Sequence, residues 1–401
     1  MNRMYRHIFE KIVIAFFVFL SLGSCRQKDI DDNLPQLYFL NNGKAVEIAV
    51  SDLVDSITYI PLNTAECLLG YVERVQRDGD FLFVKDNNGL HVFNKFGDYI
   101  NSIGKKGQGP QEYAYINSFY LDRKNRHVCI ISYPDLKHLE YSYSGEFVSV
   151  TRLTKEDAYV SSIYAMYDGC LLVHRPLPNE RDNFIGEYTL LQEKDSKFVS
   201  YLLLEGLKNK SLNALYSLLY YPMTFWKGNY YAISTFLDVV YRYDDKALVP
   251  EFRLGLTNMA PSKDFMKKHA DKDIFSLLKV LDEERIGKGI TFIAGTDNYL
   301  FMGVSHGQTV VYDGEKAVLL KPNIYHSDVD AYFYSLITSG INGDMLGVYD
   351  AEFLKSKEYY ILQGDNSKLK EMVEGLNEDD NPVVFQCYWK KDLLKRIEEI
   401  L

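Results

Sequence analysis

The chain repeats a pattern of short strands along most of its length, and this repeat restricts its fold more than any other feature. Each copy has an apolar strand, a polar turn, a second strand with an aromatic residue, a Gly or Asp turn, and a third strand. We count six copies in the sequence, and they recur about every 45 residues, which is typical of β-propeller blades. Their first strands occupy residues 81–84, 128–131, 170–173, 231–233, 299–302 and 345–348. We therefore expect an all-β, six-bladed β-propeller with these strands innermost in each blade.

Two strands outside the copies indicate how the ring closes. Residues 57–60 form a strand before the first full copy, and residues 383–388 form one near the end. Pairing of strands from the two termini removes open sheet edges, so we expect these two to share a blade. Between Ser262 and Gly287 the apolar spacing is helical, which predicts a small helical insertion. Short C-terminal helices are expected at 367–376 and 390–401.

The N-terminus has the order of a secretory signal: basic residues, an apolar run over 12–22, and then small residues before Cys25. The apolar run is too short to span a bilayer. The Leu-Gly-Ser-Cys sequence resembles the bacterial lipobox, which implies cleavage after residue 24 and lipidation of Cys25. Residues 25–36 then form a flexible tether, and 37–401 form the propeller. The acidic cluster in the tether resembles the export signal of Bacteroidetes surface lipoproteins. The expected location is the bacterial outer membrane, with surface exposure and a simple solvated linker left as alternatives.

The expected mature chain is strongly acidic. Residues 1–24 hold three basic residues and one acidic residue, so the remainder has 42 Lys+Arg, 54 Asp+Glu and a formal charge of −12. This charge argues against nucleic acid as a partner, because nucleic acid binds basic surfaces. The cysteines that follow Cys25 form no CxxC or other metal-ligand spacing. We expect Cys129 and Cys170 to be small buried residues, whereas disulfide pairing stays open.

A glycine-rich segment, GKKGQGPQEY from Gly104 to Tyr113, is the sharpest local motif. It lacks the Gly-Lys-Ser/Thr of a phosphate-binding loop, and Pro110 discourages the helix that such a loop needs. The segment resembles the Gly-x-x-Gly-x-Gly-Pro-x-Glu-aromatic turn of the six-bladed β-propeller lipoproteins of Bacteroidetes. That family is related in shape to NHL-repeat propellers, and its biochemical function is largely unknown. The resemblance extends to residues 59–75 and 378–384 and implies a structural role for Gly104, Gly107, Gly109, Pro110 and Glu112.

Polar residues follow the first strand of each copy, where a propeller would present them at the mouth of its central channel. We expect them to converge on one funnel, although each also has a plain interpretation as a turn residue. The candidate ligand-binding residues are Asp86, Tyr133, His174, Arg175, Thr235, His306 and Asp350, with Lys85, Ser234, Ser305 and Tyr349 beside them.

Two functions remain open from the sequence. The first is a non-catalytic module that binds a glycan or peptide, or docks onto an envelope protein through the 262–287 insertion. Tyr133, Tyr220 and Tyr221 would suit stacking on sugars. The second is a metal-dependent hydrolase or lyase in the same funnel, resembling six-bladed lactonases and lyases. It has weak support, because two carboxylates or two histidines are too few for a calcium or zinc site. No cofactor and no catalytic residue is predicted.

Overall fold

The computed structural model describes residues 33–401, apart from 159, 167–168, 176–187, 195–196, 205–218, 220, 245–246, 322–324, 333–336 and 339–344. The expected signal at 1–24, Cys25 and most of the expected tether lie outside the described residues. Residues 35–401 form one compact unit.

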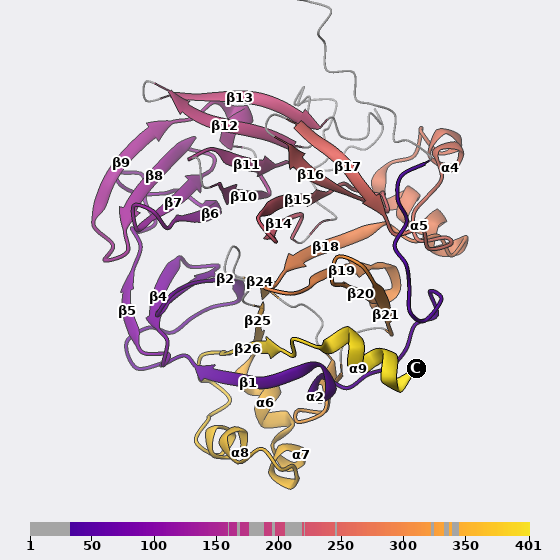
Figure 1. The fold of residues 1–401 in the computed structure, drawn as a ribbon. Helices are drawn as coiled ribbons and strands as arrows, with labels where there is room; N and C mark the ends of the chain where they lie inside the picture. The colour runs from indigo at the N-terminus through magenta and orange to yellow at the C-terminus, as the bar shows by residue number, and fades with distance from the viewer. Residues whose placement is uncertain are drawn as a thin grey trace, which may run out of the picture. The chain divides into compact units, whose positions relative to one another are not determined.

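Six four-stranded antiparallel sheets make up this unit and surround a common centre, as a six-bladed propeller requires (Figure 1). In the first three blades the strands follow chain order from the centre outward. Blade 1 contains β2 (Val72–Asp78), β3 (Phe81–Asp86), β4 (Leu90–Asn94) and β5 (Tyr99–Ser102). Blade 2 contains β6 (Ile116–Asp122), β7 (His127–Ser132), β8 (Lys137–Ser142) and β9 (Phe147–Arg152). Blade 3 contains β10 (Ser162–Ala165), β11 (Leu171–His174), β12 (Tyr188–Lys194) and β13 (Lys197–Leu204).

The next two blades repeat this order, and the last departs from it. Blade 4 contains β14 (Met223–Trp226), β15 (Asn229–Ile233), β16 (Val239–Asp244) and β17 (Ala247–Arg253). Blade 5 contains β18 (Ile290–Gly295), β19 (Leu300–Val304), β20 (Thr309–Tyr312) and β21 (Ala317–Leu320). Blade 6 contains β24 (Ile337–Thr338), β25 (Met345–Tyr349), β26 (Val383–Trp389) and β1 (Val54–Pro61).

The six-bladed prediction is confirmed, but the strands expected to be innermost are the second of each blade. β3, β7, β11, β15, β19 and β25 each have another strand between them and the centre. Inner strands such as β2 (VERVQRD) and β6 (INSFYLD) mix polar and apolar residues. The apolar runs of the second strands are covered on both faces and give the stronger sequence signal.

The ring closes by pairing the two ends of the unit, as predicted. Tyr59 of β1 lies opposite Phe385 of β26, and Ile60 lies opposite Val384. β1 thereby becomes the outermost strand of blade 6.

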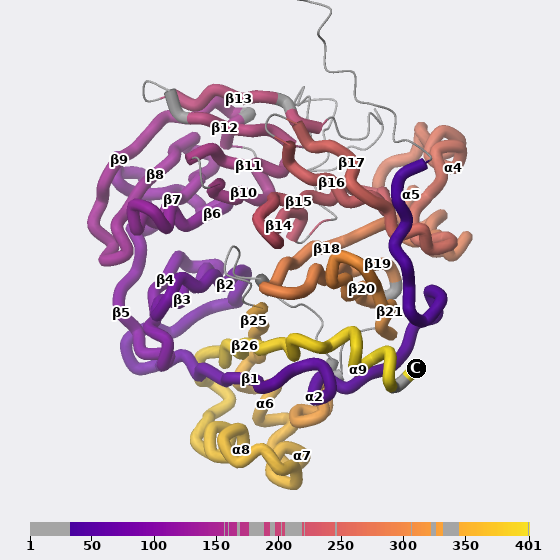
Figure 2. The backbone as a smooth tube through the Cα atoms, viewed as in Figure 1, coloured from indigo at the N-terminus to yellow at the C-terminus, as the bar shows by residue number. Residues whose placement is uncertain are grey.

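The segment before β1 binds the rims of two other blades. Gln36 bridges to Arg253 at the end of β17, whereas Phe39 and Val46 bridge to the two ends of β21. Figure 2 shows this segment along the outer edge of blades 4 and 5. It occupies backbone groups that an outermost strand would otherwise leave free.

Helices occur at the predicted places and at some others. The insertion holds two helices, α4 (Lys263–Lys268) and α5 (Ile274–Glu283), and the Ser262 side chain caps α4 as expected. α8 (Ser367–Glu374) and α9 (Leu393–Ile400) match the expected C-terminal helices. The remaining short elements are α2 (Val50–Leu53), α3 (Lys155–Ala158), the 3-10 turn η1 (Ser305–Gly307), the hairpin β22 (Tyr325–His326) and β23 (Ala331–Tyr332), α6 (Ala351–Ser356) and α7 (Glu358–Gln363).

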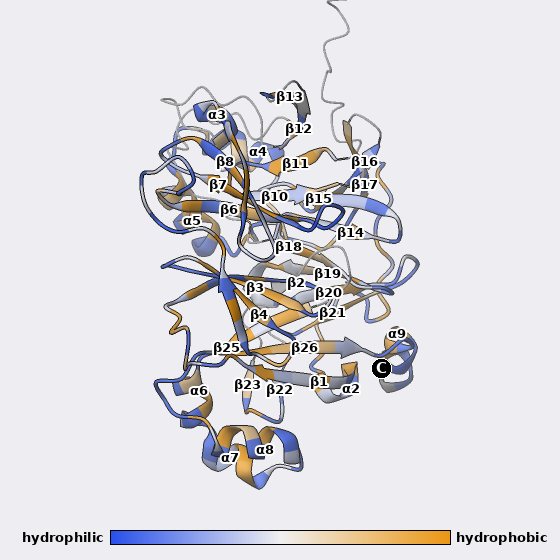
Figure 3. Ribbon diagram, turned by 90° about the vertical axis from the view of Figure 1, so that its left-hand side faces the viewer, coloured by the Kyte–Doolittle hydropathy of each residue, from blue (hydrophilic) through white to orange (hydrophobic). Residues whose placement is uncertain are grey.

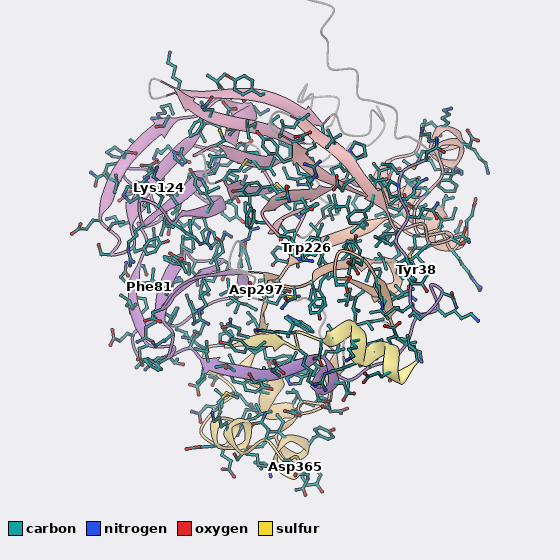
Figure 4. All side chains as sticks on the ribbon, in the orientation of Figure 1. Tyr38, Phe81, Lys124, Trp226, Asp297 and Asp365 are labelled. Carbon is teal, nitrogen blue, oxygen red and sulfur yellow. The ribbon has the colours of Figure 1, made fainter. Side chains whose placement is uncertain are left out.

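Apolar side chains fill the spaces between the blades and under the added helices. Figure 3 shows hydrophobic residues concentrated along the strands, while α7 and α8 carry both kinds of residue. Figure 4 places Asp365 at the far end of the projection formed by α7 and α8, and Tyr38 on the segment that precedes β1. No helix in the described part of the chain has the length and apolar character needed to cross a membrane.

Candidate functional site

Asp86 is buried at the end of β3 and is bonded within its own turn. Its carboxylate accepts hydrogen bonds from the backbone N–H groups of Gly70 (2.7 Å), Asn88 (2.8 Å) and Gly89 (2.6 Å). His91 Nε2 lies 3.3 Å from its Oδ1. Burial acts to raise the pKa of Asp86, but these hydrogen bonds outweigh it and lower the pKa to about 2. Asp86 is therefore an anion that organises the β3–β4 turn.

His174 and Arg175 are buried at the end of β11 and bond inside blade 3. His174 Nδ1 pairs with the Ser161 hydroxyl. Arg175 donates to the Thr189 hydroxyl and lies 3.8 Å from Asp157. Both side chains are therefore engaged by partners within the blade.

The other predicted site residues lie in four further blades. Thr235 is buried after β15, and Tyr133 is partly buried after β7. Asp350 is exposed at the N-cap position of α6. His306 is in η1, and its side chain is outside the described part of the structure. All seven positions end or follow second strands, and none of them is among the residues that line the axial cavity described below. Their convergence on one ligand-binding funnel stays a prediction.

The glycine-rich segment forms a compact turn between β5 and β6. Gly109 N–H donates to Glu112 Oε2 at 2.9 Å, and Lys137 Nζ donates to the carbonyl oxygens of Gly109 (2.8 Å) and Glu112 (2.7 Å). A Cβ on Gly107 would lie 2.0 Å from Glu112 Oε2, so a larger residue there would displace this carboxylate from its bonds to Gly109 and Lys105. Lys105 is exposed and pairs with Glu112 at 3.2 Å, which reduces its availability to an anionic ligand.

The axis of the propeller holds a cavity of about 40 Å³ that the sequence interpretation missed. The innermost strands of blades 1 to 4 line it, together with the residues beside them. Its polar and aromatic lining includes Arg74, Gln76, Arg123, Tyr164 and Tyr221. Residues 72–78 combine valines with polar residues over a strand-like length just before the apolar strand 81–86, and this mixed segment is the signal that could have identified β2 as an inner strand.

Arg74 differs electrostatically from the other arginines described here. Its guanidinium lies 5.8 Å from the centre of the Tyr221 ring, a cation–π distance. Burial lowers the pKa of Arg74, and the neighbouring Tyr221 acts in the opposite direction. Arg242 and Arg253, in contrast, pair with Glu251 and Asp238. In the described part of the chain no carboxylate pairs with Arg74.

Three segments carry the family resemblance. Residues 59–75 and 378–384 bond to each other, and the glycine-rich segment lies beside them. Asn381, which is buried, donates to the carbonyl oxygens of Asn63 (3.0 Å) and Cys67 (2.6 Å) and accepts from Leu69 N–H (2.7 Å). The loop it holds continues to Gly70, which binds Asp86. Tyr113, at the end of the glycine-rich segment, has its pKa raised to about 12 by burial and by the nearby Asp86.

A set of potential metal ligands lies between blades 2 and 3, away from the predicted funnel. The donor atoms of Cys129, His138 and Glu140 lie within 4.8 Å of one another. Cys129 and His138 are buried, and Tyr120 OH is 2.8 Å from His138 Nε2. The Tyr120 hydroxyl already bonds one ring nitrogen of His138, and the three residues are packed between strands. This set therefore gives no support to a metal-dependent hydrolase or lyase in the predicted funnel. Neither His174 nor Asp86 takes part in it.

Comparison with solved structures shows the same fold in another bacterial protein. A protein of Bacteroides fragilis named as a "putative exported protein" is 21% identical, with a TM-score of 0.70, over 87% of this chain and 98% of that one. A DUF4221 member from Bacteroides vulgatus is 10% identical, with a TM-score of 0.47, over 84% of this chain and 97% of that one. At these identities only the first likeness informs the fold, and neither informs the activity.

Sequence comparison gives a family but no activity. No curated protein sequence matches the chain. The family DUF4934, described as a domain of unknown function, matches residues 36–388, which include all six blades except the last residue of β26. The chain therefore belongs to the DUF4934 family.

Proposed function

We propose that this protein is an exported lipoprotein whose propeller channel is a non-catalytic binding site for a glycan or peptide that carries an anionic group. Arg74, a channel cation with no carboxylate partner in the described structure, is the observation that carries this proposal. An unpaired, partly desolvated guanidinium favours a carboxylate, sulfate or phosphate, to which it donates paired hydrogen bonds.

The aromatic surroundings of Arg74 favour a ligand with a flat or apolar face beside its charge. Tyr221 and Tyr164 line the same cavity, and Tyr71 is 76% exposed near Tyr221. Tyrosine rings stack on sugars and on peptide side chains while their hydroxyls stay hydrated. The cavity is small, so we expect the charged end of the ligand to enter it and the rest to lie at the mouth.

Export and lipid anchoring are supported by the N-terminal sequence. The basic start, the short apolar run and the lipobox-like residues before Cys25 direct the chain across the inner membrane and to a lipid anchor. A structural neighbour from Bacteroides fragilis is also named as exported. We propose an outer-membrane location, with the acidic tether favouring the cell surface.

Docking onto an envelope protein is a second candidate, and the helical insertion favours it. Phe275 on α5 is 71% exposed, whereas Leu277 and Leu281 of the same helix are buried against Phe236 and Phe265. If Phe275→Ser abolishes co-purification of an envelope partner while ligand binding by the channel persists, docking is a separate function of the insertion.

A binding screen tests the channel proposal. Uronic-acid and sulfated oligosaccharides and peptides with a free carboxyl terminus are titrated against the purified protein, each beside its neutral counterpart. We expect acidic members to bind and Arg74→Gln to weaken their binding at least tenfold. Arg242→Gln, which removes a paired surface arginine, is the matched control. Equal binding of neutral and acidic ligands, or unchanged binding by Arg74→Gln, would contradict the proposal.

A further inference from the structure

A second group of reactive side chains lies in blade 1, outside the channel. Cys67 Sγ is 3.5 Å from His91 Nδ1, and His91 Nε2 is 3.3 Å from Asp86 Oδ1. A thiol, an imidazole and a carboxylate thus follow one another through hydrogen-bond distances. The three residues come from the loop after β1, from β4 and from the end of β3.

Asp86 determines which nitrogen of His91 carries the proton. Its carboxylate is anionic at neutral pH and only accepts hydrogen bonds, so Nε2 donates to it and Nδ1 keeps a lone pair. Nδ1 faces Cys67 and also lies 2.9 Å from the Ser102 hydroxyl, which in turn is 2.8 Å from Tyr99 OH. Ser102 is held from two sides, whereas the sulfur has no second hydrogen-bond partner in the described structure.

The loop that carries Cys67 is fixed on both sides of the sulfur yet open to solvent. Asn381 holds the Cys67 carbonyl and the Leu69 N–H, and Asp86 holds the Gly70 N–H. Leu68 is 68% exposed and Tyr71 is 76% exposed. Cys67 itself is partly buried and packs against the hydrophobic cluster that includes Ile60 and Val75, while Leu68 and Tyr71 are exposed in the same loop.

Cys67 is less buried than the other three cysteines that follow Cys25. Cys129, Cys170 and Cys387 are buried in the blades, while Cys67 is only partly buried. Burial and the nearby Asp86 raise the pKa of Cys67. The thiol therefore keeps its proton at neutral pH and needs a base at the moment of attack, which is the role His91 is placed to fill.

We propose that Cys67 is a nucleophile that accepts acyl groups from apolar esters, with His91 as its general base and Asp86 as a positioning residue. The sulfur forms a bond to the ester carbonyl carbon, and the carbon–oxygen bond to the leaving alcohol breaks. The thiol proton moves to His91 Nδ1 and then to the departing alkoxide. The product is a thioester on Cys67, with the acyl chain beside Leu68 and Tyr71.

An acylation experiment on the purified full-length protein tests this proposal with p-nitrophenyl butyrate as the probe. We expect release of p-nitrophenol together with one butyryl group on the Cys67 peptide, detected by mass spectrometry. Cys67→Ala should remove that group, and His91→Gln should slow its formation at least tenfold. Cys387→Ala is the matched control and should react as the wild type does.

Two results would overturn the proposal. One is a butyryl group found on other residues and not on Cys67. The other is equal acylation of Cys67 in His91→Gln and wild type, which would mean an exposed thiol without a base. Circular dichroism of each variant shows whether the fold is kept, and iodoacetamide labelling of Cys67 in His91→Gln shows whether the sulfur is still accessible.

Discussion

The side-chain amide of Asn381 donates a 2.6 Å hydrogen bond to the carbonyl oxygen of Cys67, which lies 314 positions earlier in the chain. This bond joins the segment leading into the last strand of the propeller to the loop after its first strand. The same side chain satisfies Asn63 and Leu69.

Asn381→Ala is expected to destabilise the protein strongly. It leaves two carbonyl oxygens and one N–H without their partner at a buried site, which costs about 2 to 4 kcal/mol. Urea unfolding followed by tryptophan fluorescence measures the change in the free energy of unfolding. Asn377→Ala, at an exposed position nearby, is the control. A loss below about 1 kcal/mol would show that water replaces these bonds.

Gly107→Ala should destabilise the glycine-rich turn by about 1 to 3 kcal/mol, because the added Cβ overlaps the Glu112 carboxylate. The double variant with Glu112→Ala should lose less than the sum of the two single changes, because the overlap disappears. Thermal unfolding of the four proteins measures this coupling. Strict additivity would argue that the strain arises from the backbone and not from Glu112.

His326 should make the protein less stable in mild acid. Its ring lies between Tyr59 OH (2.7 Å from Nε2) and Tyr349 OH (2.9 Å from Nδ1). Burial lowers the pKa of His326 from 6.5 to about 4. Below pH 6.5 the unfolded chain binds a proton that the folded protein excludes, so the free energy of unfolding falls with pH, by up to about 1.4 kcal/mol per unit. The fall continues until the pH approaches 4.

Variants of the two buried histidines show how much each contributes to this slope. His326→Gln should flatten the plot of unfolding free energy against pH between 6.5 and 4 relative to the wild type. His138→Gln should have a similar effect, because burial also lowers the pKa of His138 to about 4. If both variants keep the wild-type slope, carboxylates alone cause the acid sensitivity.

Ile60→Ala tests the contribution of ring closure to stability. Ile60 is 3% exposed and packs on Val384, its partner on β26. Removing its buried methyl and methylene groups should cost about 2 to 4 kcal/mol. Val148→Ala, on the exposed face of β9, should change stability by less than about 0.5 kcal/mol. Equal effects of the two changes would indicate that closure contributes little.

More of the fold than of the candidate site could be predicted from the sequence. The apolar second strands recur regularly enough to count the blades, and strands 57–60 and 383–388 stand outside the copies. β2 was missed because its VERVQRD sequence is mostly polar and contains no apolar run. The prediction placed Asp86 in a funnel because a polar residue at the end of a strand is available to a ligand unless other groups bond to it. Neighbouring groups do bond to Asp86, and sequence spacing does not show those hydrogen bonds. The approach of Cys67 to His91 depends on a loop held by Asn381, and local sequence carries no sign of that contact.

The pairing of β1 with β26 in blade 6 also determines when this blade can be completed during folding. β1 leaves the ribosome long before its partner β26, with over 300 residues between them. During that interval β1 has no strand beside it, and blade 6 stays incomplete until nearly the whole chain has been made. Interrupted synthesis therefore leaves an unpaired strand with an open edge, which other strands can pair with.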